Sequence, residues 1–472
     1  MTSRWCSLPG LALIACASTP MHATRPASSP ATAPVPAAAP GPYHDPDRKR
    51  GELPTADRRE TELAALHADL TAVYAHRLEK EQRYSLDEPA LFAATERRLL
   101  AATSWAGYDS AIYDLLAQFH DDHLTYHPPS TAAPSAGWVS FRLGLATVLA
   151  GDHLLISSVE PSGALAAAGV APGDEVVAID GIAVSAVLAR EVKRRVWSRP
   201  ESARTSWART WTSLLYGKGE APRVRTLAIA ARVSGAVRDV AITPVEAVHA
   251  KRDAVVGTVT GDVAMLAFRL LEGRNAEKEI DVALATARTM HRLVIDFRGV
   301  RGGVDRVGYR VVAGLAEGTA AMGKARVLLA PETRAARPKW HDLAAEADGF
   351  SAPIALDVQA QPPGQGFHGK VAVIVDAGCA STCEVVTAAL RANLHAVVVG
   401  ETTAGSSGAP IELALPVTGG NIAVPTWNLI AADGHPIEGD GVVPDLVVVP
   451  TADALAAGRD APLDAAIART AP

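Results

Sequence analysis

The sequence predicts a multidomain α/β protein with an N-terminal helical domain, a β-rich domain and a C-terminal α/β core. Its 472 residues suffice for two or three domains, and 48% hydrophobic with 20% charged residues is ordinary globular composition. Apolar residues recur at helical spacing near the start, short strands follow, and strands then alternate with helices. The net charge of −6 gives no reason to expect nucleic acid as a partner.

The first residues are typical of an exported protein. Arg4 precedes a short apolar segment, and Leu13-Ile14-Ala15-Cys16 resembles the bacterial lipobox. Residues 1–16 are therefore expected to form a lipoprotein signal peptide. Cys16 is the expected lipidation site and the first residue of the mature protein. The alternative is a plain signal peptide that is cut near residues 23–25.

Residues 17–54 are rich in Ala and Pro and are expected to form a linker without a core of its own. No later stretch is long and apolar enough to suggest a further membrane span. We therefore expect a periplasm-facing lipoprotein of the bacterial cell envelope, in the outer membrane, or a secreted protein.

Residues 55–130 are expected to form the helical domain. Apolar side chains fall three and four residues apart from Leu63 to Leu78, so one face of this helix is apolar. Two further helices are expected, one through Leu100 and one through Phe119. The domain ends in a polar segment with several histidines, and Pro128 follows it.

Residues 137–247 carry two motifs of a peptide-binding domain. The loop Leu143-Gly144-Leu145 precedes a strand, and Pro172 to Gly181 reads Pro-Gly-Asp-Glu-Val-Val-Ala-Ile-Asp-Gly. With these motifs the segment resembles a PDZ domain of the bacterial, circularly permuted kind. The resemblance implies that the Leu143 to Leu145 loop and its strand bind an extended peptide by β-augmentation.

A basic helical insertion at 184–218 interrupts this PDZ-like segment. It contains several Lys and Arg residues together with Trp197, Trp207 and Trp211. Such a stretch can contact lipid headgroups or an acidic substrate. It can also be a solvated helix that is packed by its tryptophans, and this is the commoner case.

Residues 257–472 are expected to form the α/β core. Short apolar strands at 263–268, 293–297, 371–375 and 396–400 alternate with helices, which favours mainly parallel strands. Residues 331–368, with several Pro and Gly, are expected to be a flexible loop.

Ser381 lies at a small-residue turn between the strand at 371–375 and the helix that begins near Val385. Such a turn can raise a nucleophile out of the sheet. With Glu384 three residues further on, Ser381 also fits the N-cap of a capping box. Local sequence leaves both roles open.

Four motifs occur in a recognisable order in the core. They are Asp-Phe-Arg-Gly-x-x-Gly-Gly at 296–303, Cys-Ala-Ser-Thr-Cys-Glu at 379–384, Gly-Glu-Thr-Thr-Ala-Gly at 400–405 and Glu-Gly-Asp-Gly-Val-Val-Pro-Asp at 438–445. With the preceding segments, they resemble the C-terminal processing (tail-specific) serine peptidases over nearly everything after residue 55. The resemblance implies a crotonase/ClpP-like peptidase core.

One departure from that family affects the mechanism. Its serine/lysine members carry Gly-Lys-Gly after the Gly-Glu-x-Thr motif, and the lysine is their general base. Here Ala-Gly-Ser-Ser-Gly stands at 404–408. The chain resembles instead the tricorn-like and retinoid-binding-protein-like branches, which use a histidine at the end of the helical domain and a glutamate near the C-terminus. His123 and Glu438 stand at those positions.

The resemblance implies a catalytic triad of Ser381 as nucleophile, His123 as base and Glu438 as the carboxylate that orients the imidazole. Asp122 is a second candidate for orienting His123. The backbone N–H of Thr382 and that of Gly302 or Gly303 are the expected oxyanion-hole donors.

Residues 120–123, His-Asp-Asp-His, could instead bind a metal ion, but no distant third ligand motif accompanies them. We therefore expect no metal and no cofactor.

Cys379 and Cys383 flank Ser381 and have three readings. In an oxidising compartment they could form a disulfide across the start of the helix. They could also be half of a zinc site or two reduced, buried thiols.

The resulting function hypothesis is an exported serine endopeptidase that binds extended or C-terminal peptide segments through a PDZ domain and hydrolyses peptide bonds. The expected partners are a peptide or protein substrate and, through the lipid anchor, a membrane. The alternative is a non-catalytic peptide- or lipid-binding scaffold on the same fold.

Overall fold

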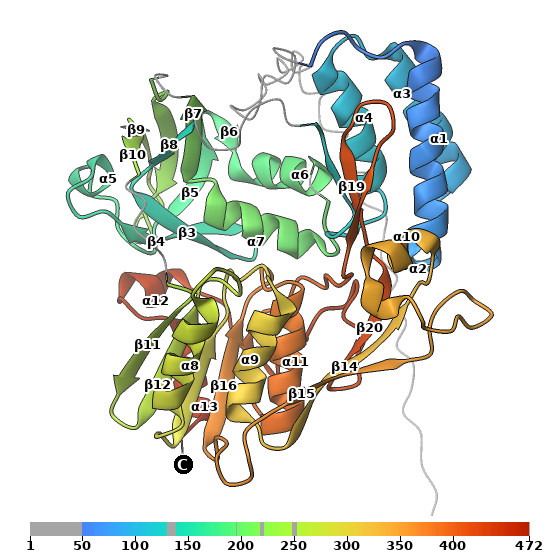
Figure 1. Cartoon of the computed structure of the whole chain (residues 1–472). Helices are drawn as coiled ribbons and strands as arrows, with labels where there is room; N and C mark the ends of the chain where they lie inside the picture. The colour runs from blue at the N-terminus through green and yellow to red at the C-terminus, as the bar shows by residue number, and fades with distance from the viewer. Residues whose placement is uncertain (1–49, 130–137, 195, 218–220, 248–252, 472) are drawn as a thin grey trace, which may run out of the picture. The chain divides into compact units, whose positions relative to one another are not determined.

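The computed structural model describes residues 50–129, 138–194, 196–217, 221–247 and 253–471. The expected signal peptide at 1–16, with Cys16, and residues 17–49 of the expected linker lie outside the described residues. Within the described ranges, no helix is long and apolar enough to cross a membrane. The fold is a mixed α/β arrangement of a helical segment, a β-rich segment and an α/β core (Figure 1).

Three of the four helices of the N-terminal segment pack around one apolar cluster. They are α1 (Ala56–Val73), α3 (Glu88–Ala101) and α4 (Trp105–Ala117). Leu66 and Leu70 meet Ile112 in this cluster, and Ile422 of β19 (Asn421–Val424) belongs to it as well. These helices therefore share their core with a strand from near the other end of the chain. The fourth helix is α2 (Arg77–Tyr84).

The single helix expected from Leu63 to Leu78 is two helices. The chain leaves the helical path after Val73, and the backbone N–H of Ala75 donates to Pro425 O at 2.9 Å. Leu78, expected on the apolar face, is 68% exposed. The break instead buries His76 and Lys80.

The β-rich segment forms two antiparallel sheets. The larger has the strand order β3-β4-β5-β8-β9, with β3 at one edge and β6 paired to β5, and the smaller has the order β10-β2-β7. The strands are β2 (Trp138–Arg142), β3 (Leu145–Ala150), β4 (His153–Val159), β5 (Glu175–Ile179), β6 (Ile182–Ala183), β7 (Ser213–Gly217), β8 (Arg225–Ala230), β9 (Val237–Ile242) and β10 (Val245–Glu246).

Helices α5 (Ala164–Ala167), α6 (Val184–Arg194) and α7 (Pro200–Thr210) complete this segment. The basic insertion contributes α6, α7 and β7. Trp207 of α7 stacks on Trp211 with ring centroids 5.7 Å apart, and both are buried in the core of the segment. These tryptophans therefore pack the insertion against the sheet.

The α/β core is built on a six-stranded sheet with the order β11-β12-β13-β16-β17-β21. Only the β11/β12 pair is antiparallel among these neighbours, so the sheet is mainly parallel, as expected from the alternation of strands and helices. The strands are β11 (Val255–Thr260), β12 (Val263–Phe268), β13 (Arg292–Asp296), β16 (Lys370–Val375), β17 (Val397–Gly400) and β21 (Leu446–Val447).

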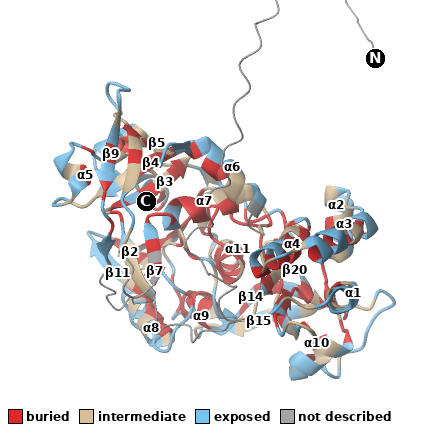
Figure 2. Cartoon of the chain, turned by 90° about the horizontal axis from the view of Figure 1, so that it is seen from above, coloured by how far each residue is buried: buried red, intermediate tan, exposed pale blue. Residues whose placement is uncertain are grey.

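Strand β16 is buried on both faces. Val371, Val373 and Val375 belong to the cluster with helices α8 (Ala276–Ala287), α9 (Asp305–Leu315) and α11 (Thr382–Leu394), whereas Ile374 belongs to the cluster with α13 (Ala461–Arg469). Helix α11, which follows β16, is itself buried along most of its length (Figure 2). Ser381 therefore stands between two of the most deeply buried elements.

Residues 331–368 were expected to be a flexible loop, and this expectation is wrong. They contain α10 (Pro331–Ala336), a 3₁₀ turn and β15 (Ile354–Gln359). β15 pairs with β14 (Thr319–Val327), which pairs in turn with β20 (Trp427–Ala431). Ile354, Leu356 and Val358 pack on the core at every second position, which is the period of a half-buried strand.

Candidate active site

Ser381 occupies a strained corner between β16 and α11. Its backbone has φ 57° and ψ −126°, a left-handed conformation that costs roughly 1–3 kcal/mol for a residue other than glycine. The Glu384 carboxylate accepts the Ser381 backbone N–H at 3.0 Å, as in a capping box. The Ser381 hydroxyl instead lies 3.2 Å from His123 Nε2. The residue therefore begins a helix while its oxygen faces an imidazole.

Glu384 ties this corner to the loop that follows β17. Its buried carboxylate also accepts hydrogen bonds from Thr403 Oγ1 at 2.5 Å, Gly405 N at 2.7 Å and Ser406 N at 2.8 Å. Burial raises the pKa of Glu384 to about 8, whereas these donors favour its ionised form. Because one carboxylate bonds to both segments, Ser381 and Ser406 are held in a fixed relation.

Cys379 and Cys383 form a disulfide with their Cα atoms 5.6 Å apart. Both residues are fully buried. Of the three readings of this pair, the structure contains the disulfide. It links the residue two before Ser381 to the first turn of α11, and so it restricts the same corner as Glu384.

His123 follows α4 and precedes β1 (Thr125–His127), and it is 258 residues from Ser381 in the sequence. Its backbone N–H donates to Asp121 Oδ1 at 3.0 Å. Its Nδ1 lies 2.9 Å from Ser406 Oγ while its Nε2 faces Ser381. Burial lowers the pKa of His123, although Asp121 and Asp122 act to raise it. The imidazole is therefore favoured in its neutral form, which can accept a proton.

The expected contact between Glu438 and His123 is not formed. Glu438 Oε1 accepts from Lys80 Nζ at 2.5 Å, and its Oε2 accepts from Ser407 N at 2.8 Å. Both oxygens of Glu438 are therefore bonded to groups other than His123. Glu438 is linked to the imidazole indirectly, because it bonds to the backbone of Ser407 and the neighbouring Ser406 contacts His123 Nδ1.

Asp122, the second candidate for orienting His123, pairs with Arg301 instead. The two carboxylate oxygens accept from Arg301 Nη2 at 3.2 and 3.3 Å. Asp122 acts on His123 through charge alone, since no described hydrogen bond joins the two side chains.

Ser406 is a candidate site residue that the sequence analysis missed. Its side chain is buried, and its hydroxyl is the group at His123 Nδ1. Ser406 directly follows Gly405. In the serine/lysine peptidases, this part of the motif reads Gly-Lys-Gly and contains the lysine. A hydroxyl residue at this place was the available signal.

Gly302 is the better placed of the two oxyanion-hole candidates. With φ 92°, a Cβ atom built on it would lie 2.8 Å from Ser381 Cβ and 3.3 Å from Thr382 N. A Cβ on Gly303 would instead meet Leu271 O at 2.5 Å. No hydrogen bond of the described residues uses the backbone N–H of Thr382 or Gly302. Both groups are therefore available to an oxygen bound beside Ser381.

The predicted peptide-binding loop lies outside this constellation. Leu143 is buried, and its backbone N–H donates to Thr212 O at 3.2 Å. Gly144 has φ 74°, and Leu145 begins β3 at the sheet edge.

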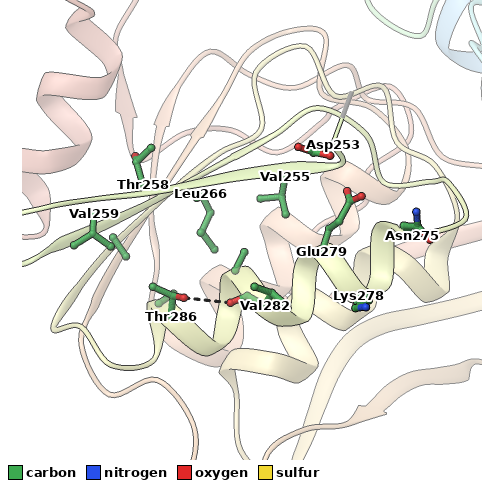
Figure 3. A pocket seen from close by; sticks show the side chains of 14 residues that line it. Asp253, Val255, Thr258, Val259, Leu266, Asn275, Lys278, Glu279, Val282 and Thr286 are labelled. Carbon is green, nitrogen blue, oxygen red and sulfur yellow. Dashed lines mark hydrogen bonds between the residues drawn. The ribbon is translucent and has the colours of Figure 1, made fainter. Parts of the chain in front are cut away.

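A cavity of about 550 Å³ lies elsewhere, between β11, β12 and α8 (Figure 3). Its lining includes Val255, Leu266 and Val282. None of the predicted catalytic residues lines it.

Comparison with known proteins identifies the core. Residues 260–448 match the model of peptidase family S41. The chain therefore contains a peptidase family S41 domain. This domain includes Ser381, Gly302 and Glu438, whereas His123 comes from the segment before it.

Solved structures of CPAF share the fold of the chain around this S41 domain. The structure of mature CPAF aligns with a TM-score of 0.65 and 16% identity over 85% of this chain and 94% of that chain. The photosystem II D1 C-terminal processing protease aligns with a TM-score of 0.47 and 19% identity over 83% of this chain and 93% of that one. A search among curated proteins finds no significant match.

We expect His123 to titrate below its ordinary pKa of about 6.5 in the folded protein, because burial disfavours the imidazolium. NMR titration of the imidazole measures this midpoint. Asp122→Asn removes a charge that raises the pKa and should lower the midpoint further, whereas Arg301→Gln removes a charge that lowers the pKa and should raise the midpoint. A midpoint above 6.5, or one that neither variant moves, would contradict the assignment.

Proposed function

We propose that this chain is a serine endopeptidase in which Ser381 attacks the peptide carbonyl and His123 acts as general base. The observation that carries the proposal is the 3.2 Å distance between Ser381 Oγ and His123 Nε2. A serine hydroxyl becomes a useful nucleophile only when a positioned base can take its proton. The S41 domain supports the same activity class.

Ser406 has the role of the orienting group in this proposal. With Nδ1–H donating to Ser406 Oγ, the lone pair of Nε2 points at the Ser381 hydroxyl. His123 takes the proton of Ser381 as the acyl-enzyme bond forms and then gives it to the departing amine. The chain thus uses a Ser-His pair with a hydroxyl on the second nitrogen, where a lysine base is missing.

The Thr382 and Gly302 backbone N–H groups are the proposed donors to the oxyanion. One such donor is typically worth roughly 10²–10³ in rate, because it is aimed at the charge that develops in the transition state. Glu384 and the disulfide hold the Ser381 corner rigid, which is what preorganised donors require.

We further propose that substrate is recognised by the PDZ-like segment. β3 ends its sheet, and no strand of the described residues pairs with its outer edge, where an extended peptide would add by β-augmentation. The Leu143 N–H is already bonded to Thr212, which favours capture of an extended strand over capture of a terminal carboxylate at that amide. A non-catalytic scaffold is not favoured, since Ser381 and His123 lie within hydrogen-bond reach.

The proposed location is the bacterial cell envelope, facing the periplasm, with Cys16 lipidated and residues 17–54 as the tether. The Cys379–Cys383 disulfide supports an oxidising compartment. In this proposal, the lipid anchor attaches the protein to the membrane.

Hydrolysis of an unstructured peptide tests the proposed activity. Ser381→Ala and His123→Ala should each lower kcat by about 10⁴-fold or more, because each removes one member of a group that acts as a unit. Circular dichroism and thermal unfolding check that the variants are folded. Wild-type rates in either variant would exclude this mechanism.

Ser406→Ala and Ser407→Ala form a matched pair. Loss of the Ser406 hydroxyl leaves His123 Nδ1 without its partner, so kcat should fall about 10- to 100-fold with KM nearly unchanged. The Ser407 hydroxyl is buried and makes no hydrogen bond among the described residues, so Ser407→Ala should stay within about twofold of wild type. Equal effects of the two changes on kcat would argue against the role of Ser406.

The anchor has its own test. Cys16→Ala should move the protein from the membrane fraction to the soluble periplasmic or secreted fraction, since a lipid anchor depends on that thiol. Immunoblotting of cell fractions measures this change. An unchanged membrane fraction would favour another mode of attachment, and a wild-type protein in the soluble fraction would favour the plain signal peptide.

A further inference from the structure

Four charged side chains lie together beneath His123. They are His76 and Lys80 near helix α2, Asp121 two residues before His123, and Glu438 of the C-terminal loop. Lys80 and Asp121 are fully buried, and His76 is 1% exposed. Burying unpaired charges is costly, so this group requires an explanation beyond packing.

Both ring nitrogens of His76 face hydrogen-bond acceptors. Nδ1 lies 2.7 Å from Asp121 Oδ2, and Nε2 lies 2.8 Å from Trp427 O. A carbonyl oxygen and a carboxylate are both acceptors, so each nitrogen must donate and the ring is an imidazolium. Burial acts to lower the pKa of His76, but Asp121 and then Glu438 raise it, and the net shift is upward.

The cluster is electrically balanced in this state. With Glu438 ionised, the positive charges of His76 and Lys80 match the negative charges of Asp121 and Glu438, two against two. Burial and then Asp121 raise the pKa of Glu438 to about 7, and Lys80 and His76 act against this rise. Lys80 Nζ bonds to Glu438 Oε1 at 2.5 Å and to His120 O at 3.0 Å. His76, Asp121 and Glu438 together resemble a metal-ligand set, with ligand atoms within 4.8 Å of one another. Lys80 already supplies the positive charge that a metal would bring to Glu438.

Both carboxylates hold the backbone next to the catalytic groups. Asp121 Oδ1 accepts the His123 N–H at 3.0 Å. Glu438 Oε2 accepts the Ser407 N–H at 2.8 Å, and the neighbouring Ser406 contacts His123 Nδ1. Asp121 thus fixes the backbone of His123. Glu438 fixes the backbone beside Ser406, whose hydroxyl contacts Nδ1 of the imidazole.

We propose that His76 and Lys80 are positioning residues of the active site, because they bond to Asp121 and Glu438 and hold these two carboxylates in place around His123. The inference rests on the proposed peptidase function and deepens it. Neither residue touches the reacting atoms. They act through the two carboxylates on the orientation of the imidazole.

A charge-neutralising double substitution tests this role. Lys80→Met removes the ammonium group that bonds to Glu438, and Glu438→Gln removes the carboxylate that bonds to Lys80. Each single change therefore leaves the buried cluster with one unbalanced charge. Each single change should lower kcat about 100-fold with KM within about twofold. The double variant Lys80→Met/Glu438→Gln keeps an amide oxygen for the Ser407 N–H and no longer buries a lone charge, so its kcat should recover to within about 10-fold of wild type.

Arg83→Met is the matched control. Arg83 lies three residues after Lys80 on α2 and pairs with Asp440, two residues after Glu438, but this pair is exposed to solvent. Its loss should leave kcat within about twofold of wild type, because exposed ion pairs contribute little.

NMR supplies a readout that packing alone would not move. Wild type should show two ring N–H resonances for His76, which are assigned by their loss in His76→Phe. It should also show a His123 Nδ1–H resonance. This resonance should weaken or shift in Lys80→Met and return in the double variant. A double variant no more active than the poorer single variant, or wild-type kcat in Lys80→Met, overturns the proposal, as does a single His76 N–H.

Failure of the function itself has a different signature. If Ser381→Ala hydrolyses peptide as well as wild type, the proposed peptidase mechanism fails. In that case the His76 resonances and the thermal unfolding midpoints of the Lys80/Glu438 set still decide whether the four charges form the balanced cluster. Recovery of the midpoint in the double variant would support the cluster, and its absence would contradict it.

Discussion

The buried carboxylate of Glu384 is the constraint on which the candidate active site depends. It accepts hydrogen bonds from the Ser381 corner and from three groups of the loop at 403–406, so two segments that follow different strands share one acceptor. Ser381 contributes the proposed nucleophile, and Ser406 contributes the hydroxyl at His123 Nδ1. Without this acceptor the buried N–H groups of Gly405 and Ser406 would lack a partner, which is costly in the interior. Geometry at the nucleophile and at the orienting hydroxyl is thus set by the same interaction.

The sequence left Ser381 with two roles, and the structure reconciles them. The backbone of Ser381 makes the helix-start bond to Glu384, while the side chain turns toward His123. Its left-handed conformation costs free energy, and the surroundings must enforce it. The short disulfide between Cys379 and Cys383 and the close approach of Gly302 both restrict the same turn. Strain at this place is consistent with a side chain that is held for chemistry rather than for capping alone.

Local patterns predicted several local features of this chain. The apolar run of β16 and the turn between it and the helix at Ser381 depend on a few consecutive residues and have their expected structure. The spacing of Cys379 and Cys383 left three readings open, and the structure contains the disulfide. Partnerships across hundreds of residues were not readable in the same way. Glu438 carries a carboxylate wherever it points, and only the folded chain brings Lys80 and Ser407 to it. The prediction of a flexible loop at residues 331–368 failed for a related reason. It relied on the Pro and Gly residues and overlooked the alternating apolar residues at 354–358, which form a strand that pairs with β14.

In the proposed mechanism His123 takes the place of the lysine base, and this changes what the site requires of the fold. A lysine at the position of Ser406 would stand on the same loop that Glu384 already fixes to the Ser381 corner. His123 instead belongs to the helical segment, so its distance from Ser381 depends on how that segment packs on the S41 domain. The contacts that hold it there converge on a small region: Ala75 N–H on Pro425 O, His76 on Trp427 O, and Lys80 on Glu438. The charge cluster therefore lies where the borrowed base needs support, and the shared core with β19 adds apolar contacts to the same junction. If His123 is the base, the stability of this junction sets the distance between base and nucleophile, and substitutions at the junction should affect catalysis through that distance.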